Sequence, residues 1–119
     1  MRKIGNIGED YAVKILKKNK YKIVERNFTI RGGEIDIIAK DGDYLVFAEV
    51  KLRKSAEFGR PAEFVDFKKQ EHLRTAALLY MKKMEYSGLC RFDVVEIIGE
   101  TNEKGKLLAK EVNIIKNAF

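Results

Sequence analysis

Residues 34–51 constrain the fold most, because two runs of alternating polar and apolar residues flank the dipeptide Asp41-Gly42. Asp-Gly between alternating runs is a strong signal for a β-hairpin. A tight turn at this dipeptide pairs Ile37 with Val46 and places alternate residues on opposite faces. One face, which carries Ile35, Ile37, Ala39, Tyr44, Val46 and Ala48, is then apolar throughout.

The other face of this hairpin carries charge, from Glu34, Asp36, Glu49 and Lys51. The same pairing makes Asp36 and Glu49 diagonal neighbours, roughly 7–8 Å apart at the backbone. Two like charges at this spacing on a half-buried surface are unfavourable unless a cation lies between them. Carboxylate oxygens suit Mg²⁺ or Mn²⁺. The pattern therefore predicts a divalent metal held by Asp36 and Glu49, with Glu34 as a further candidate ligand.

The rest of the chain divides into helical and strand patterns without a linker or a repeat. We expect helices at 6–19 and from Pro61 or Asp66 to about Lys83, strands at 21–31, 34–39, 44–51, 91–98 and 107–115, and a polar loop at 52–60. The order α-β-β-β-α-β-β predicts an α/β fold with a mixed β-sheet flanked by helices. A chain of 119 residues is long enough for one domain, residues 1–119, and not for two.

Glu9 has two interpretations. It lies three, four and seven residues before Ala12, Val13 and Leu16, so it belongs to the helical stripe that faces the sheet. A carboxylate aimed at the core needs a partner, and Glu9 would then close the metal site from the helix side. Alternatively, Asn6 is the N-cap and Glu9 completes a capping box for its own helix.

Composition excludes several classes of protein. With one cysteine, Cys90, and one histidine, His72, the chain has neither an internal disulfide nor a Cys/His zinc site. No apolar run approaches the ~20 residues that span a bilayer. No secretory signal follows Met1. We therefore expect a soluble, cytoplasmic protein without a membrane partner.

The positive charge is concentrated at one end. The net charge is +6, and residues 1–31 alone hold nine basic against three acidic residues. A basic surface beside an acidic pocket suits a polyanion that is held while a metal acts on it. The alternative is a solvated lysine-rich helix with no partner.

Short motifs along almost the whole chain then identify a family resemblance. They are Gly8-Glu9 with Ala12, Asn27-Phe28, Gly32–Ala39, Phe47–Lys51, Arg53, Phe58-Gly59, Lys69, Arg91–Val95 and Asn117–Phe119. On these motifs the chain is identified as a member of the YraN-like family of small bacterial proteins. That family is similar to the PD-(D/E)XK nucleases and, among them, to archaeal Holliday-junction resolvases.

The resemblance implies a restriction-endonuclease-like core and a set of catalytic residues. Asp36 stands at the position of the motif aspartate, although Ile35 replaces the proline that gives the motif its name. Glu49 and Lys51 match the acidic residue and lysine of the motif, and Glu9 matches a helical glutamate of the resolvase-like members. The implied catalytic residues are therefore Glu9, Asp36, Glu49 and Lys51.

The implied function is that of a Mg²⁺- or Mn²⁺-dependent endonuclease acting on structured or branched DNA. We expect Lys51 to stabilise the charged transition state, and flanking phosphates to be held by Arg53, Lys54, Lys69, Lys14, Lys17, Lys18 and Arg31. Four-way junctions would require a homodimer with two sites, and charge alone does not distinguish DNA from RNA. The alternative is an adaptor that binds nucleic acid on the nuclease fold without cleaving it.

Four residues outside this set have ordinary interpretations. His72 is expected to pack or to face solvent rather than to act as a base. Cys90 is expected to be a small buried hydrophobic residue. Arg91 and Asp93 lie on one face of a strand and are expected to form an ion pair.

Overall fold

In the computed structural model, the backbone is described for residues 4–54 and 65–119, and the side chains from residue 7 onward. Two helices and five strands follow one another as α1 (Ile4–Lys18), β1 (Lys22–Ile30), β2 (Gly33–Asp41), β3 (Tyr44–Arg53), α2 (Phe67–Lys83), β4 (Leu89–Thr101) and β5 (Leu107–Ile115). The predicted order of elements is confirmed. The expected loop at 52–60 begins later, because β3 continues to Arg53, and its remainder lies largely outside the described residues.

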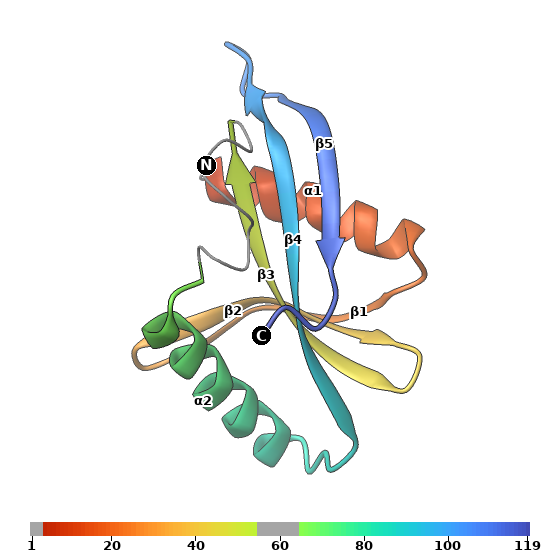
Figure 1. Cartoon of the computed structure of the whole chain (residues 1–119), viewed down its shortest axis with the longest axis vertical. Helices are drawn as coiled ribbons and strands as arrows, with labels where there is room; N and C mark the ends of the chain where they lie inside the picture. Colours follow the sequence, from red (N-terminus) through yellow and green to blue (C-terminus); the bar gives the residue numbers. More distant parts are fainter. Residues whose placement is uncertain (1–3, 55–64) are drawn as a thin grey trace.

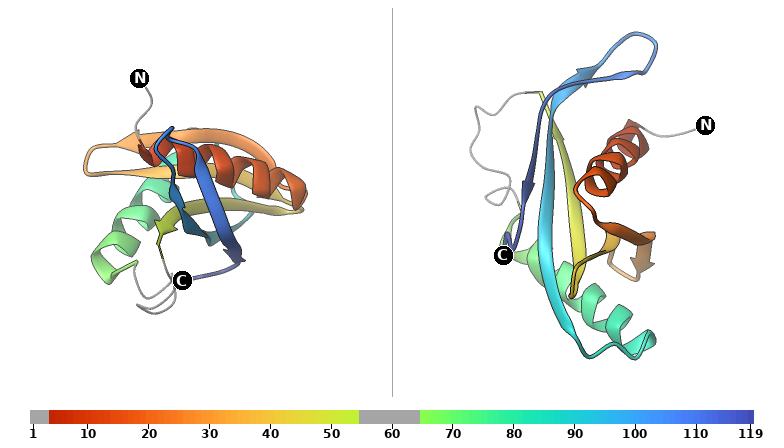
Figure 2. Two further views of the ribbon diagram at one scale, coloured as in Figure 1. Left: turned by 90° about the horizontal axis from the view of Figure 1, so that it is seen from above. Right: turned by 90° about the vertical axis from the view of Figure 1, so that its right-hand side faces the viewer.

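The five strands form one mixed sheet in the order β1-β2-β3-β4-β5. Strands β1, β2 and β3 are successive antiparallel neighbours, β3 and β4 are parallel, and β5 returns antiparallel to β4. A parallel pair needs a crossover connection, and α2 lies within the one between β3 and β4. Figures 1 and 2 show the β1–β2 hairpin running across the direction of the long strands. The chain is thus an α/β protein with a mixed sheet.

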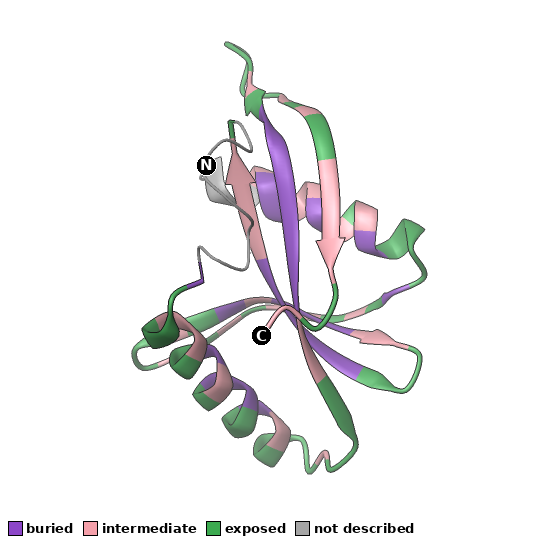
Figure 3. Ribbon diagram, viewed as in Figure 1, coloured by how far each residue is buried: buried purple, intermediate pink, exposed green. Residues whose placement is uncertain are grey.

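The helices pack against separate apolar clusters of the sheet. Ala12 and Leu16 of α1 lie with Val46, Ala48 and Val95, all buried. The neighbouring residues Phe47 and Val94 belong instead to the cluster beneath α2, which supplies Leu73, Ala76, Ala77 and Tyr80. Because neighbouring strand residues point to opposite faces, α1 and α2 cover opposite faces of the sheet. Figure 3 shows this burial along the middle of β4 and on the inner sides of both helices.

The β2–β3 turn lies one residue later than predicted. Asp41 pairs with Tyr44, so the two loop residues are Gly42 and Asp43 rather than Asp41 and Gly42. Gly42 has a φ of 59°, as the first central residue of a type II′ turn requires. The pairing therefore shifts by two positions, and Ile37 faces Ala48 instead of Val46. A shift of two preserves the faces, which is why most of the predicted apolar face survives.

The alternation of faces breaks at Asp36. Ile37 packs in the cluster under α1, whereas Ile35 packs in the cluster under α2, so the prediction that both share one face is wrong. The backbone ladder between β2 and β3 ends at Ile37 and Ala48. Opposite Asp36 in β1, Asn27 adopts a positive φ of 54°. Beyond this point β2 continues with β1 and departs from β3.

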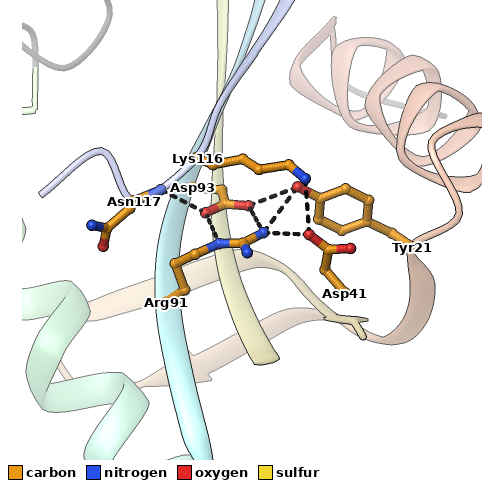
Figure 4. A network of polar contacts seen from close by, with 6 residues as sticks. All are labelled: Tyr21, Asp41, Arg91, Asp93, Lys116 and Asn117. Carbon is orange, nitrogen blue, oxygen red and sulfur yellow. Dashed lines mark hydrogen bonds and ion pairs between the residues drawn. The ribbon is translucent and has the colours of Figure 1, made fainter. Parts of the chain in front are cut away.

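A buried polar network joins four parts of the chain (Figure 4). The fully buried carboxylate of Asp93 accepts hydrogen bonds from the Tyr21 hydroxyl at 2.8 Å, from Arg91 Nε and Nη2 at 2.8 Å each, and from the Asn117 backbone N–H at 3.0 Å. Arg91 Nη2 also donates to Asp41 at 2.7 Å. The predicted Arg91–Asp93 ion pair is confirmed, and it ties β4 to the start of β1, the end of β2 and the C-terminus.

The first residues of α1 and α2 test two further predictions. α1 begins at Ile4, so Asn6 lies within the helix and is not its N-cap. α2 begins after Asp66, whose side chain accepts a hydrogen bond from the Lys69 backbone N–H at 2.7 Å. The later of the two starts expected for this helix is therefore confirmed. Neither of the described helices is long and apolar enough to cross a membrane.

Candidate functional site

A cavity of about 310 Å³ lies where β2 departs from β3. It is lined by Gly8, Glu9, Glu34, Asp36, Glu49, Val50, Leu52 and Lys69. These residues come from the start of α1, from β2 and β3, and from the first turn of α2. The cavity therefore collects three of the four predicted catalytic residues from segments that are far apart in the sequence.

Asp36 is held against β3 by its side chain. Its Oδ2 accepts a hydrogen bond from the Val50 backbone N–H at 2.9 Å, where the regular strand pairing has ended. Burial raises the pKa of the Asp36 carboxyl above its ordinary value, while the Val50 hydrogen bond opposes this rise. Asp36 thus satisfies an N–H group of β3 and is also one of the residues that line the cavity.

Glu49 is the most perturbed carboxylate of the site. Its side chain is buried, and its Oε2 has no hydrogen-bond partner among the described residues. Burial, and next the negative charge of Asp36, raise the pKa of Glu49 from its ordinary 4.5 to about 7. Its Oε1 lies 3.7 Å from Lys69 Nζ and 4.0 Å from Lys51 Nζ. A buried carboxylate with one free oxygen is a group that gains from a bound cation.

Glu9 enters the cavity from α1. It is 8% exposed, and its Oε1 has no hydrogen-bond partner within the described part of the chain. Burial raises the pKa of Glu9, and the negative charge of Asp36 raises it further. The helix begins five residues before Glu9, so the interpretation of Glu9 as a capping residue is wrong. The interpretation that places Glu9 at the acidic site agrees with the structure.

The donor atoms suit a hard divalent cation, with one restriction. No three Asp, Glu, His or Cys side chains of the described residues converge closely enough to form a complete ligand set. Mg²⁺ does not need one, because it usually keeps several waters and binds through one or two carboxylates together with substrate phosphates. The free buried oxygens of Glu49 and Glu9 are therefore consistent with an ion held chiefly by Asp36 and Glu49.

The other hairpin residues lie at the rim. Glu34, the further candidate ligand, lines the cavity but is exposed. Lys51 follows Glu49 on the same face of β3 and is half-buried. Lys69, which was predicted only to hold a flanking phosphate, instead lines the cavity and pairs with Glu49. Sequence patterns gave Lys69 a place on a helix, but could not show that the first turn of this helix packs beside β3.

The remaining basic residues divide into two groups. Arg53 and Lys54 line a second hollow of about 400 Å³ that shares Leu52 with the acidic cavity. The others lie elsewhere and are exposed: Lys14, Lys17 and Lys18 on α1, and Arg31 at the tip of the β1–β2 hairpin. At 1.5 Å per helical residue, Lys18 lies about 13 Å further along α1 than Glu9. The structure therefore brings two of these six residues next to the site.

Two residues outside the site complete the comparison with the sequence. His72 is exposed on α2, as predicted. Cys90 is exposed, so the prediction of a buried cysteine is wrong. The reason is that β4 begins at Leu89, and its first two residues lie beyond the buried part of the strand.

The fold and the cavity define a class: an α/β protein with a five-stranded mixed sheet and a carboxylate cavity flanked by lysines. Residues 8–97 match the sequence model of the uncharacterised protein family UPF0102, and the chain belongs to this family. The family membership predicted from the motifs is thereby confirmed.

Relatives in this family extend along the whole chain. The UPF0102 protein of Caldicellulosiruptor saccharolyticus is 45% identical over 119 residues, covering 99% of this chain and 98% of the relative. That of Acetivibrio thermocellus is 48% identical over 121 residues, covering 99% and 92%. That of Clostridium kluyveri is 43% identical over 117 residues, covering 98% and 93%.

Proposed function

We propose that this protein is a metal-dependent endonuclease with a restriction-endonuclease-like core, which hydrolyses phosphodiester bonds in DNA. The observation that carries the proposal is the buried Glu49 carboxylate, which has one oxygen without a hydrogen-bond partner among the described residues and lies in a cavity with Asp36 and Glu9. Buried acidic groups grouped in a cavity are costly for stability and are typical of sites that work on a charged ligand.

Asp36 and Glu49 would hold Mg²⁺ or Mn²⁺ together with waters and the substrate phosphate. Glu9 and the rim residue Glu34, also among the described residues, line the same cavity but do not converge with these two carboxylates into one ligand set. When bound, such an ion polarises the scissile phosphate and lowers the pKa of a coordinated water. The carboxylates of this chain would orient the ion, and the cavity that they line would hold the phosphate beside them. Neutralisation by the ion also removes the cost of keeping two carboxylates ionised side by side.

The reaction is a displacement at phosphorus. A water oxygen forms a bond to phosphorus, the bond to the leaving sugar oxygen breaks, the water gives up a proton and the leaving oxygen gains one. Lys51 contributes positive charge near Glu49, which stabilises the charge that develops on the phosphate. Arg53 and Lys54 in the adjoining hollow would contact phosphates next to the scissile one.

The substrate that the resemblance favours is structured or branched DNA. A four-way junction presents two equivalent strands, so its symmetric cleavage requires two copies of this chain. RNA carries the same phosphate charge and is the control polymer for any binding measurement.

A cleavage assay tests the proposal. Labelled duplex, single-stranded, flap and four-way-junction DNA are incubated with Mn²⁺, with Mg²⁺ and with EDTA, and Asp36→Ala is the inactive control. We expect cleavage of at least one DNA form that needs the metal and is lost in the variant. Wild-type protein that cuts no substrate with either metal would contradict the proposal.

An adaptor that binds nucleic acid without cleaving it is the second candidate. One observation favours it: Lys69 and Lys51 already supply two positive charges to Glu49 Oε1, and the described residues form no complete metal ligand set. Binding of the same DNA forms without cutting, equal in EDTA and Mn²⁺, is the result expected of an adaptor.

A further inference from the structure

The two oxygens of Glu49 have different surroundings. Lys69 Nζ and Lys51 Nζ both approach Oε1, at 3.7 and 4.0 Å. Oε2 is buried and has no hydrogen-bond partner among the described residues. Glu49 therefore has one oxygen beside two ammonium groups and a second, buried oxygen without a hydrogen-bond partner among the described residues. A phosphate bound beside Glu49 through a cation would also come near an ammonium group.

Lys69 is fixed in this position by the start of α2. Its backbone N–H donates to the Asp66 side chain at 2.7 Å, and the side chain of the next residue, Gln70, donates to the Val65 carbonyl at 2.7 Å. Val65 is 1% exposed and belongs to the core under α2. The turn that carries Lys69 is thus capped by Asp66 and joined to the core through Val65, which holds the backbone of Lys69 in place.

Lys69 and Lys51 differ in how they meet the cavity. Of the described residues that line it, Lys69 is the only basic one, and Lys51 is not among them. Lys69 also reaches Glu49 from α2, whereas Glu9 lines the same cavity from α1. Lys51 reaches Glu49 as its neighbour along the same face of β3. The position of Lys69 is the one that a phosphate in the cavity would meet.

The geometry points to Lys69 as the catalytic lysine: its ammonium donates a hydrogen bond to a non-bridging oxygen of the scissile phosphate. This inference rests on the proposed function, and it replaces the sequence-based role of Lys69 as a contact for flanking DNA. The hydrogen bond stabilises the negative charge that grows as the water oxygen bonds to phosphorus and the leaving oxygen departs. Lys51 then contributes less than Lys69 to the stabilisation of this negative charge.

Three substitutions of lysine by methionine test this role, because each removes one charge and keeps the length of the side chain. They are Lys69→Met, Lys51→Met and, as the matched control, Lys68→Met, which alters the exposed neighbour in the same turn of α2. With the DNA form that the wild type cuts best, we expect Lys69→Met to lower the rate at least about 100-fold. We expect less than about tenfold for Lys51→Met and less than about twofold for Lys68→Met.

Metal affinity provides a second measurement that does not depend on cleavage. Mn²⁺ is titrated calorimetrically into each variant without DNA. Loss of a positive charge 3.7 Å from Glu49 removes repulsion of the dication, so Lys69→Met should bind Mn²⁺ at least about threefold more tightly. Slower cleavage with tighter metal binding is not expected of a variant that has merely lost structure. Lys69→Arg, which keeps the charge, should recover at least about a tenth of the wild-type rate.

The outcomes separate the inference from the proposed function. An active wild type whose Lys69→Met variant cuts within about threefold of it contradicts the inference alone, and so does a Lys69→Met variant that binds Mn²⁺ more weakly. A wild type that cuts no substrate contradicts the proposed function and the role of Lys69 with it. Slow cleavage, tighter Mn²⁺ binding and recovery by arginine together support the inference.

Discussion

Asp36 replaces a backbone hydrogen bond with a side-chain one: its carboxylate accepts from the Val50 N–H at 2.9 Å, just where the β2–β3 ladder has stopped. This contact joins the architecture to the site. The strands separate here, which opens the cavity, and the hydrogen bond keeps Asp36 beside Glu49 despite the separation. The same carboxylate therefore has a structural and a proposed metal-binding role, and substitutions can separate the two.

Asp36→Asn should leave the fold intact and weaken the binding of Mn²⁺. The amide oxygen can still accept from Val50 N–H, and removal of a buried negative charge relieves its repulsion with Glu49, so stability should stay near that of the wild type. Mn²⁺ affinity should fall at least about tenfold, because one of two unit charges next to the ion is lost. Asp36→Ala should in addition lose about 1–3 kcal/mol in urea unfolding, since it leaves the N–H unpaired.

The exposed turn residue Asp43 offers a control, because Asp43→Asn makes the same change outside the cavity. Calorimetric titration of Mn²⁺ into the two variants measures whether the affinity depends on Asp36. An Asp36→Asn variant with wild-type Mn²⁺ affinity would show that this carboxylate is not a metal ligand.

The pKa of Glu49 predicts how stability depends on pH. Because this pKa is about 7 in the folded protein and 4.5 ordinarily, the folded state binds more protons between these values. The contribution of Glu49 to the free energy of unfolding therefore decreases as pH rises from about 4.5 to 7. Without metal, Glu49→Gln should be more stable than wild type at pH 8, by about 3 kcal/mol, and nearly equal to it at pH 4.5.

Urea unfolding in EDTA from pH 4.5 to 8 measures this effect, with the exposed Glu111→Gln as the matched control. Saturating Mg²⁺ should reverse the order at pH 8, because a dication stabilises the ionised carboxylate of the wild type. Parallel stability curves for wild type and Glu49→Gln across this range would contradict the raised pKa.

Much of the fold followed from local patterns. The order of elements and the span of β5 were predictable, because alternation and helical spacing are local properties. The hairpin register was wrong by two positions, since Asp41-Gly42-Asp43 offers two places for a two-residue loop and the positive φ of Gly42 suits the later one. An even shift by itself leaves each side chain on its predicted face, so the acidic residues of the hairpin still lie together.

What could not be predicted depends on contacts between distant segments. The change of face at Asp36 arises where β2 leaves β3, and strict alternation does not allow for it. Lys69 reached Glu49 because α2 crosses from β3 to β4 and starts beside the cavity. Cys90 is of a residue type that is usually buried, but it lies near the start of β4, where this strand pairs with β3 and not with β5, and it is exposed. In each case the surroundings of the residue depend on tertiary geometry rather than on residue type.

The network around Asp93 should control stability rather than cleavage. Asp93→Asn replaces an acceptor oxygen by an N–H₂ group and leaves the half-buried Arg91 without its main partner, which should cost about 3–5 kcal/mol. Tyr21→Phe removes the hydroxyl that donates to Asp93 and accepts from Arg91 Nη2, and it should cost about 1–2 kcal/mol. Urea unfolding measures both, with Lys110→Gln at an exposed position outside the network as a control that should cost less than about 0.5 kcal/mol.

Because Tyr21 is not among the residues that line the cavity, Tyr21→Phe should also cleave DNA at the wild-type rate. A loss of activity in this variant at a temperature where it is folded would mean that the network acts on the site.

The two groups of basic residues can be separated by salt dependence. Arg53 and Lys54 line the hollow beside the acidic cavity, whereas Lys17 and Lys18 lie at the far end of α1. The double variants Arg53→Gln/Lys54→Gln and Lys17→Gln/Lys18→Gln each remove two charges, so the net charge is the same in both. Each lost phosphate contact should reduce the slope of log K against log salt by about 0.9 for duplex DNA.

We expect the first double variant to lose close to two contacts, because its residues adjoin the site where the scissile phosphate would lie. The second should lose fewer, unless the bound DNA also extends along α1. Fluorescence anisotropy with labelled DNA at several salt concentrations, in EDTA to prevent cleavage, measures both slopes. Equal slopes in the wild type and the Arg53→Gln/Lys54→Gln variant would exclude this hollow from the binding path.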